Sequence, residues 1–521
     1  MTEIPRDSQS SPVSIPRTLV GLLSGLLVAM LASSIVSTSL PRIAGDLGGG
    51  QGTLTWIVTA TLLAITVSTP IWGKLSDLLS RKALLCAALV LFVAGSLLAG
   101  FAPEPLTLIV GRALQGLGAG GLLSLVQIVM ADIISPRERG KYMGLFGAVM
   151  AFGTIGGPLI GGLVTDVFGW RWNFFASAPI ALFSLVIIFF TLPAHVGRGR
   201  ARIDYVGALL ITLGISGVLV WVTLGGSLFA WDSPTSWLTL GASVLVLVLA
   251  IVVETKVPEP ILPIDLFRNP GFVLTVVASA SVGVATYGAA VFMSQYLQLA
   301  RGSSATDSSL AALPQLIAVT IASTVVGALI SRSGNWKRWM VFGACCQTVG
   351  MAVLGTITTQ TPMIVIWVCM ALVGTGIGSI MQNLVLMAEI NVSARQLGVA
   401  SAGVVFFRTL GGAIGVAGLG ALIQARSQSL ALTQSDWLAN AGYNTAPLDL
   451  ANFDGAGAVA GPVQDAIQAA YARAIGDAYL VGAALAALTV CAILLLPAKP
   501  LSTRTRQQRL EEEGEGDSSA A

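Results

Sequence analysis

Long runs of apolar residues, separated by short polar stretches, recur along the whole chain. Most runs are about 20 residues or longer, which lets a helix cross a hydrocarbon core ~30 Å thick. A transmembrane β-barrel would instead show alternating strands of about 10 residues, and the sequence contains no such pattern. We therefore expect an all-α polytopic membrane protein. The predicted spans, fourteen in number, are 18–40, 53–76, 82–102, 106–131, 141–165, 171–193, 204–225, 235–255, 270–298, 307–331, 337–358, 362–388, 397–424 and 470–496.

Lysine and arginine predict how these helices are oriented. With the N-terminus inside, the tails and the loops on the same side hold 21 of the 28 basic residues. Because cytoplasmic loops carry an excess of Lys and Arg, both termini are expected in the cytoplasm, with an even number of spans in the plasma membrane. Two arginines, Arg112 and Arg408, fall inside apolar runs. The outer loops hold Arg42, Arg171, Arg301, Arg426 and Arg473.

Composition supports this class and excludes several functions. Charged residues make up 10% of the chain, against about 25% in soluble domains. The net charge is +3 with no basic run, so no nucleic-acid partner is expected. The five cysteines lie in apolar runs, which argues against a disulfide framework or a zinc site. The chain has no GxxxxGKS loop and no His–Cys cluster, so we expect no ATP site, metal or cofactor, and no enzyme.

An internal repeat predicts the domain organisation. The stretch GKLSDLLSRK at 73–82 and the stretch GALISRSGNWKR at 327–338 both place a glycine at a helix end and basic residues before the next helix. Their offset of eight helices suits two related six-helix halves with two helices inserted, a common plan in transporters. The expected parts are an N-tail at 1–17, a bundle at 18–194, an inserted pair at 204–256, a second bundle at 269–497 with an outer loop at 425–469, and a C-tail at 498–521.

Three stretches carry candidate chemistry. The first is GKLSDLLSRK at 73–82. In it Gly73 allows two helices to approach closely, and Asp77 and Arg81 are spaced to meet on a helix, although the charged residues could be plain inner-surface anchors. In the second, LIVGRALQGLGAGG at 108–121, Arg112 is costly inside a bilayer and must face a cavity, find a partner or snorkel outward. Glycines on one face of the third, GLFGAVMAFGTIGGPLIGG, allow tight helix packing, and its proline bends the helix. The marked positions in this third stretch are Gly144, Gly153, Gly157, Pro158, Gly161 and Gly162.

Together with FGWRWNFF at 168–175 and FRTLGGAIGVAG at 407–418, these stretches resemble the major facilitator superfamily. In particular, they resemble its fourteen-helix drug:proton antiporters, the multidrug exporters of the EmrB and QacA type. The resemblance implies that Asp77 faces the N-terminus of the thirteenth helix, where the helix dipole favours a carboxylate, and that Asp132 also pairs with Arg81 in a conformational switch. It further implies proton coupling at Arg112 beside Gln115, and it makes the glycine-rich fifth helix an antiporter element.

One departure from the family concerns charge. Members that export cations carry an aspartate in the first helix, where this chain has Ala32. Asp477, near the start of the last span, is the remaining candidate for a proton site beside Arg112, with Glu389 at the inner surface as a competing idea. Since Arg112 and Arg408 are both intramembrane, we expect anionic, zwitterionic or neutral amphipathic substrates rather than permanent cations.

The expected function is proton-coupled export of drugs or other amphipathic small molecules by a monomer in the lipid bilayer. The alternatives are export of a specific anionic or lipid-like metabolite and a non-transporting membrane sensor on the same fold. A large apolar site with few polar anchors suits hydrophobic compounds, although each aromatic could equally serve packing. The expected cavity residues are Trp56, Gln115, Tyr287, Gln295, Tyr296, Gln298, Gln382, Asn383 and Arg408.

Overall fold

A computed structural model of the chain describes residues 15–47, 51–134, 136–192, 204–225, 229–257, 263–303, 310–390, 396–440 and 462–498, with a few single positions between them. Residues 1–14 of the predicted N-tail, most of the C-tail and residues 441–461 of the predicted outer loop lie outside the described residues, whereas residues 15–17 of the predicted N-tail begin α1. The described part is helical apart from one isolated β-bridge between Gly225 and Phe229.

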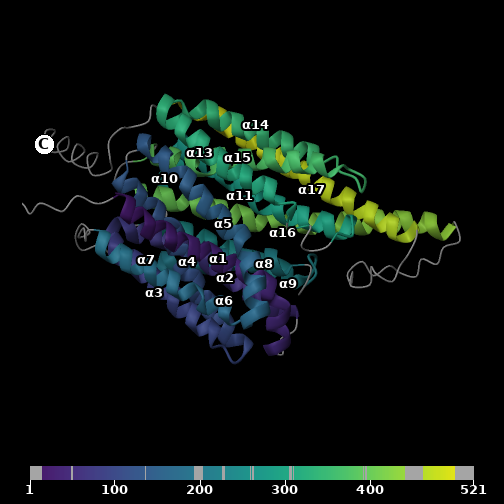
Figure 1. Cartoon of the computed structure of the whole chain (residues 1–521), viewed down its shortest axis with the longest axis horizontal. Helices are drawn as coiled ribbons and strands as arrows, with labels where there is room; N and C mark the ends of the chain where they lie inside the picture. Colours follow the sequence, from purple (N-terminus) through teal and green to yellow (C-terminus); the bar gives the residue numbers. More distant parts are fainter. Residues whose placement is uncertain are drawn as a thin grey trace, which may run out of the picture.

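The first half of the chain folds into a bundle of long helices, seen in purple and blue in Figure 1. Pro105 stands in the first turn of its helix, where its missing N–H costs no hydrogen bond. A one-residue break at Ala176 divides the predicted span 171–193 into two helices. The elements are α1 (Ile15–Leu47), α2 (Gln51–Leu78), α3 (Arg81–Gly100), α4 (Pro105–Ile133), α5 (Pro136–Phe168), α6 (Trp172–Phe175) and α7 (Ser177–Thr191).

A second bundle forms from the last part of the chain, in green and yellow in Figure 1. Gly334, in the left-handed conformation, ends one of its helices, as a C-terminal glycine commonly does. A short π-helix, η1, continues α11 at its outer end. The elements are α10 (Asp265–Arg268), α11 (Pro270–Gln295), η1 (Tyr296–Ala300), α13 (Leu313–Ser333), α14 (Trp336–Leu354), α15 (Met363–Ile390), α16 (Leu397–Asn440) and α17 (Pro462–Leu495).

The same arrangement of helices occurs twice. In the first half α1 packs on α4, α5 and α7, while α3 packs on α4 and α7. In the second half α11 packs on α15, α16 and α17, while α14 packs on α15 and α17. The helices that follow the two repeated stretches, α3 and α14, thus hold equivalent places, as the repeat in the sequence predicts.

The two halves meet along two helix pairs, α5 with α13 and α2 with α16. Each pair joins helices from different halves. We call the end of the molecule that carries the α2–α3 and α4–α5 connections the inner end, since it is the end predicted to face the cytoplasm. The α2–α16 contact lies at this inner end, so the structure shows the two halves closed against each other there.

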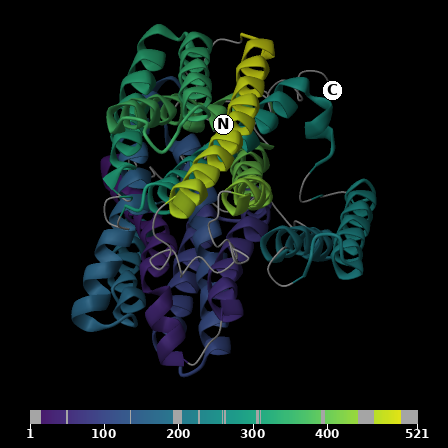
Figure 2. The same cartoon turned by 90° about the vertical axis from the view of Figure 1, so that its right-hand side faces the viewer.

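Two helices between the halves form a hairpin, α8 (Tyr205–Leu224) and α9 (Pro234–Glu254). Figure 2 shows this teal hairpin at the edge of the molecule. One apolar cluster joins α8 to both halves through Val67 of α2, Ile211 and Ile215 of α8, and Phe406 of α16. The inserted hairpin therefore covers the seam where α2 and α16 meet.

Every predicted span overlaps a helix, but the number that can cross a membrane differs from the prediction. Among the described residues, eleven helices are long and apolar enough to do so, and 206–222 of α8 form a shorter apolar helix. The helices α5 and α14 are not among the eleven. The fourteen-span topology therefore stays a prediction.

Two predicted spans near the last outer loop are shorter than the helices that correspond to them. The predicted span 397–424 continues as helix to Asn440, and the last helix begins at Pro462 rather than at residue 470. Both ends of the predicted loop 425–469 are therefore helical. These extensions are polar, so hydropathy does not mark them as parts of the helices, although they continue the helices beyond the apolar stretch.

Candidate functional site

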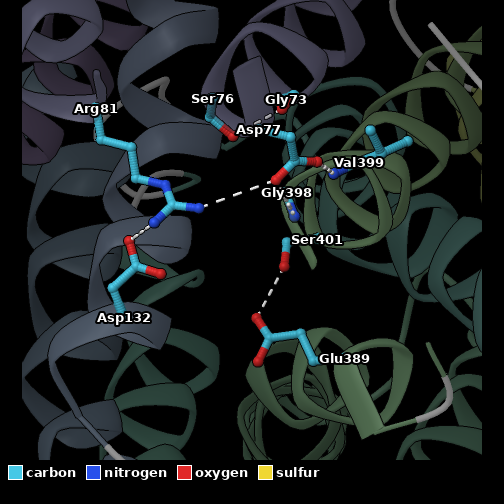
Figure 3. A network of polar contacts seen from close by, with 9 residues as sticks. All are labelled: Gly73, Ser76, Asp77, Arg81, Asp132, Glu389, Gly398, Val399 and Ser401. Atoms are coloured by element: carbon cyan, nitrogen blue, oxygen red, sulfur yellow. Dashed lines mark hydrogen bonds and ion pairs between the residues drawn. The ribbon is translucent and has the colours of Figure 1, made fainter. Parts of the chain in front are cut away.

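A charged cluster closes the inner end, and Figure 3 shows it in detail. Asp77, near the end of α2, accepts hydrogen bonds from the backbone N–H groups of Gly398 at 3.2 Å and Val399 at 3.1 Å. These two N–H groups belong to the first turn of α16, where a helix favours negative charge. The carboxylate of one half thus caps a helix of the other, as the resemblance implied. We call this contact the inner gate.

Arg81 links the gate carboxylate to the rest of the first half. Its guanidinium lies 3.9 Å from Asp77 and is hydrogen-bonded to Asp132, the penultimate residue of α4. The predicted trio of Asp77, Arg81 and Asp132 is therefore brought together (Figure 3). Its charges fix the inner ends of α2, α3 and α4 beside α16.

Gly73 lets α2 and α16 approach closely at this gate. A Cβ atom at this position would overlap Ala402 of α16 and lie 3.1 Å from the carbonyl oxygen of Gly398. Only a residue without a side chain fits here, because the opposing atoms belong to a helix backbone and a Cβ. The position of Gly73 one turn before Asp77 is thus explained by packing at the gate.

The second half has a different arrangement at the equivalent place. Its repeated stretch carries Ser331 where the first half has Asp77. Glu389, the penultimate residue of α15, occupies the place that corresponds to Asp132. Its carboxylate is buried and accepts a hydrogen bond from Ser401 of α16 at 2.8 Å. Sequence reasoning missed Ser401, although it lies one turn after the start of α16.

Arg112 sits within a buried polar chain inside the first half. It is 1% exposed, and it donates to Gln115 at 2.6 Å, to the Ala32 carbonyl at 3.1 Å and to the Ile57 carbonyl at 3.4 Å. Within the described residues these acceptors are all neutral. The guanidinium therefore does not snorkel to the outer surface, and one of its acceptors is the backbone carbonyl of Ala32, the residue at which the resemblance would expect an aspartate.

Gln115 extends this chain toward α3 and α7. Its amide donates to Ser96 of α3 at 2.8 Å, and Ser177 of α7 lies 3.2 Å from the same hydroxyl. The predicted pairing of Gln115 with Arg112 is thus observed, but Gln115 is 1% exposed. It belongs to a buried hydrogen-bond chain and does not line an accessible cavity, which corrects our prediction.

The glycine-rich helix α5 packs against both halves. Cβ atoms at Gly153 and Gly157 would overlap Met30 and Ser34 of α1, and Ser34 donates a hydrogen bond to the Gly153 carbonyl at 2.7 Å. The predicted Gly144, Pro158, Gly161 and Gly162 lie on the same continuous helix. Close packing at Gly153 and Gly157 accounts for two of these positions directly.

The stretch FGWRWNFF positions the outer end of the first half. Asn173 donates to Ser39 of α1 at 2.6 Å and to Thr165 of α5 at 2.7 Å. Trp170 donates to Asp46 at 2.8 Å. These contacts tie α1, α5 and α6 together, so this stretch has a structural role.

Arg408 of α16 and Tyr287 of α11 lie where these two helices pack together. Arg408 is 4% exposed, and Nη1 donates to the Met381 carbonyl of α15 at 3.3 Å. Tyr287 is 44% exposed, and its ring packs against Gly412, one turn along α16 from Arg408. On the same turn of α15 as Met381, Gln382 and Asn383 are buried, and Asn383 donates to the Ser379 carbonyl at 2.8 Å.

The other predicted cavity residues lie elsewhere. Tyr296 is fully buried in η1 and donates to the Thr358 carbonyl at 2.6 Å, so it is a packing residue and not a lining one. Gln295 and Gln298 are exposed near the outer end of α11, and Gln298 donates to Ser294 at 2.8 Å. Trp56 is half-buried near the start of α2.

Asp477 lies at the outer end of the second half, away from the Arg112 chain. Arg426 of α16 contacts its carboxylate at 3.1 Å and Arg473 at 3.7 Å. Its side chain is 17% exposed. The structure thus gives Asp477 arginine partners from α16 and α17, and it does not bring the two predicted coupling residues together.

No group of three or more metal-ligating side chains occurs within the described ranges. The buried polar side chains of the described residues are mostly hydroxyls and amides, with a few charged groups that include Arg112, Arg408 and Glu389.

Comparison with known proteins identifies a family model and several transporters that are similar to this chain in sequence. The family model described as Major Facilitator Superfamily matches residues 22–416. The multidrug transporter protein MdtP of Bacillus subtilis is 35% identical over 421 residues, 80% of this chain and 76% of that protein. An uncharacterized MFS-type transporter of Mycobacterium tuberculosis is 37% identical over 413 residues, 79% of this chain. The chain covers 60% of the length of this relative.

Solved structures agree on the fold. The proton:xylose symporter XylE aligns with a TM-score of 0.61 at 16% sequence identity, covering 95% of this chain and 98% of that chain. The identity is low, so the likeness concerns the arrangement of helices alone.

Proposed function

Because the chain belongs to the Major Facilitator Superfamily, a family of membrane transporters and not of enzymes, we propose that it exports hydrophobic or amphipathic small molecules. The observation that carries the proposal is the inner gate, where Asp77 of one half caps α16 of the other. A contact between halves that depends on a few charged groups can form in one conformation and break in another. Alternating access requires such a contact.

The direction of transport rests on α5. Its glycines place it against α1 and, through Gly147 and Ser323, against α13 of the other half. A helix packed this tightly on both halves suits a pivot or seal between them. The glycine pattern resembles that of antiporters, and a similar protein bears the name multidrug transporter; both favour export.

We further propose that export is coupled to protons. The buried chain from Arg112 through Gln115 to Ser96 joins α4 to α3 and responds to any charge that enters it. Asp477 stays the candidate carrier of the proton. When Asp477 binds a proton, its carboxylate loses the negative charge that holds its ion pairs with Arg426 and Arg473. Because Arg426 belongs to α16 and Asp477 to α17, protonation is thereby coupled to the packing of these two helices.

The proposed topology has fourteen spans with both termini in the cytoplasm, in the plasma membrane. The eleven long apolar helices, together with α5, α8 and α14, give this number. The excess of lysine and arginine at the inner end supports the orientation.

A second candidate, export of an anionic or lipid-like metabolite, is favoured by a specific observation. The two buried arginines, Arg112 and Arg408, contact only neutral acceptors among the described residues. Their positive charge favours an acidic substrate and disfavours a permanent cation.

The test is proton movement in everted vesicles with an imposed inside-acid gradient and a panel of cationic dyes, anionic amphiphiles and neutral antibiotics. The proposal expects a panel compound to collapse the gradient with the native chain and not with Arg112→Ala. Arg268→Ala, at an exposed site, removes an equal charge and should behave as the native chain. Collapse that is equal in all three, or in none, counts against proton antiport.

A further inference from the structure

The middle of the second half carries a buried cation whose donors are only partly used. Arg408 lies eleven residues after the start of α16 at Leu397, about 16 Å along the helix. It is therefore near the middle of a ~30 Å hydrocarbon core. A charged group at this depth is costly unless it has a partner.

The hydrogen bonds of Arg408 leave most of its guanidinium available. The side chain has five N–H donors, and the only acceptor it meets among the described residues is the Met381 carbonyl, 3.3 Å from Nη1. The side chain is 4% exposed, and Nε and Nη2 meet no acceptor in the described part of the chain. These nitrogens are the donors that a bound small molecule or water would use.

Tyr287 adds a second donor beside this guanidinium. Its ring lies against Gly412, where a Cβ atom would overlap it, and Gly283 likewise makes room for the Arg408 backbone. These glycines bring α11 and α16 together beside Arg408, and the Tyr287 side chain there is 44% exposed. The Tyr287 hydroxyl makes no hydrogen bond within the described residues, so it too can donate to a ligand.

Within the described residues, no Asp or Glu of α11, α15 or α16 is paired with Arg408. The sequence of α11 contains no Asp or Glu, and α16 has none before Asp436. On α15, Glu389 is eight residues beyond Met381, about 12 Å along the helix, and it is hydrogen-bonded to Ser401. The positive charge is therefore open to an anion from outside the chain.

We propose that Arg408 and Tyr287 form a subsite that binds the acidic head group of an amphipathic substrate. A carboxylate, sulfonate or phosphate ester accepts hydrogen bonds from a planar guanidinium at two positions, and the tyrosine hydroxyl supplies a third. This inference rests on the proposed export function and specifies its substrate class. The hydrophobic part of the ligand would then extend over the apolar side chains of the two halves.

Two fluorescent probes with the same aromatic core test the subsite by binding. Anilinonaphthalenesulfonate carries a sulfonate, and phenylnaphthylamine is the matching compound without it. The full chain in phosphatidylcholine nanodiscs is titrated with each probe, and empty nanodiscs supply the background. Native protein should bind the sulfonate more tightly than the neutral probe.

The variants identify the groups responsible. Arg408→Gln should weaken binding of the sulfonate about tenfold to a hundredfold, the range for a hydrogen bond to a charged group, and leave the neutral probe within about twofold. Arg408→Lys should retain part of the affinity, and Tyr287→Phe, which removes only a hydroxyl, should weaken the sulfonate alone. Arg268→Gln, an exposed charge, is the matched control and should change neither probe.

Three results would overturn the proposal. They are equal affinity of the native chain for both probes, an unchanged sulfonate affinity in Arg408→Gln, and an equal loss of affinity for both probes in that variant.

Adding phosphatidylglycerol to the nanodiscs distinguishes a lipid head group from a soluble substrate as the source of the anion. If it competes with the sulfonate only when Arg408 is present, the subsite holds a lipid head group instead of a soluble substrate.

Because these measurements report binding and not transport, they test the subsite independently of the proposed export function. A charge-selective site in a chain that moves no compound across vesicles would overturn export and keep the subsite. Export of the neutral probe without any charge selectivity would keep export and overturn the subsite.

Discussion

Replacing Asp77 with asparagine is expected to open the inner gate. The substitution keeps the size of the side chain and one oxygen acceptor, but it removes the negative charge. The carboxylate accepts hydrogen bonds from Gly398 at 3.2 Å and from Val399 at 3.1 Å and lies 3.9 Å from Arg81. All three interactions depend on charge, and two of them cross from one half to the other.

The size of the effect follows from these contacts. A hydrogen bond to a charged group contributes about 1.5–3 kcal/mol, and a charge at a helix N-terminus typically adds ~0.3–1 kcal/mol. Since asparagine retains part of the bonding, we expect a net loss of about 1.5–3 kcal/mol from the closed state. At about 1.4 kcal/mol for each factor of ten, the ratio of open to closed molecules should rise about tenfold to a hundredfold.

The assay is cysteine labelling at the gate. Ser76 is 2% exposed and lies beside Gly398, so a cysteine in its place becomes reactive only when α2 and α16 separate. A variant in which the five native cysteines are replaced carries Ser76→Cys, with or without Asp77→Asn. The rate of reaction with an impermeant maleimide added to everted vesicles reports the open fraction.

Two matched substitutions decide whether the reasoning holds. Asp265→Asn removes an exposed carboxylate and should leave the labelling rate unchanged. Asp132→Asn removes the other partner of Arg81, but this pair lies within the first half, so the rate should rise by less than about threefold. A labelling rate that Asp77→Asn leaves unchanged, or that rises equally in Asp132→Asn, would refute the assignment of the gate to Asp77.

Two further predictions concern the interior of the first half. Gly157→Ala should lower the free energy of unfolding by about 1–3 kcal/mol and reduce transport, because its Cβ atom would overlap Ser34. A Cβ atom at Gly156 meets nothing nearer than 3.5 Å. Gly156→Ala should therefore be tolerated in the same melting and uptake assays. Ala32→Asp should place a carboxylate beside Arg112, whose Nη1 is 3.1 Å from the Ala32 carbonyl, and should let quaternary ammonium dyes compete for transport. Ala32→Asn is the uncharged control, and competition that is equal in both variants would contradict the electrostatic reason.

The helix pattern and the gate could be predicted well from the sequence. Apolar length decides where a chain forms membrane helices, and each predicted span overlaps a helix of the structure. The residues of the gate could also be predicted, because Gly73, Asp77 and Arg81 lie within nine residues at one helix end. Their local spacing already places them close together. Asp132 was placed from the family resemblance and from its position at the inner end of α4.

Contacts between distant parts of the chain were less predictable. Whether Tyr296 faces a cavity or a neighbouring loop depends on η1, whose π-helical turn rotates the side chain toward Thr358. Asp477 was singled out by its depth in the last span, but its partner Arg426 is 51 residues away on α16, which was predicted to end before it. Helix extension beyond the apolar stretch gives no hydropathy signal, so both the boundary and the ion pair were missed.

The inserted hairpin has a kinetic consequence. Because α8 packs on Val67 of α2 and on Phe406 of α16, it touches both of the helices that must part when the gate opens. Motion between the halves therefore has to carry both helices along the surface of α8. Friction at this surface would govern the rate of each cycle, so changes in the hairpin should alter turnover while leaving the affinity for substrate the same.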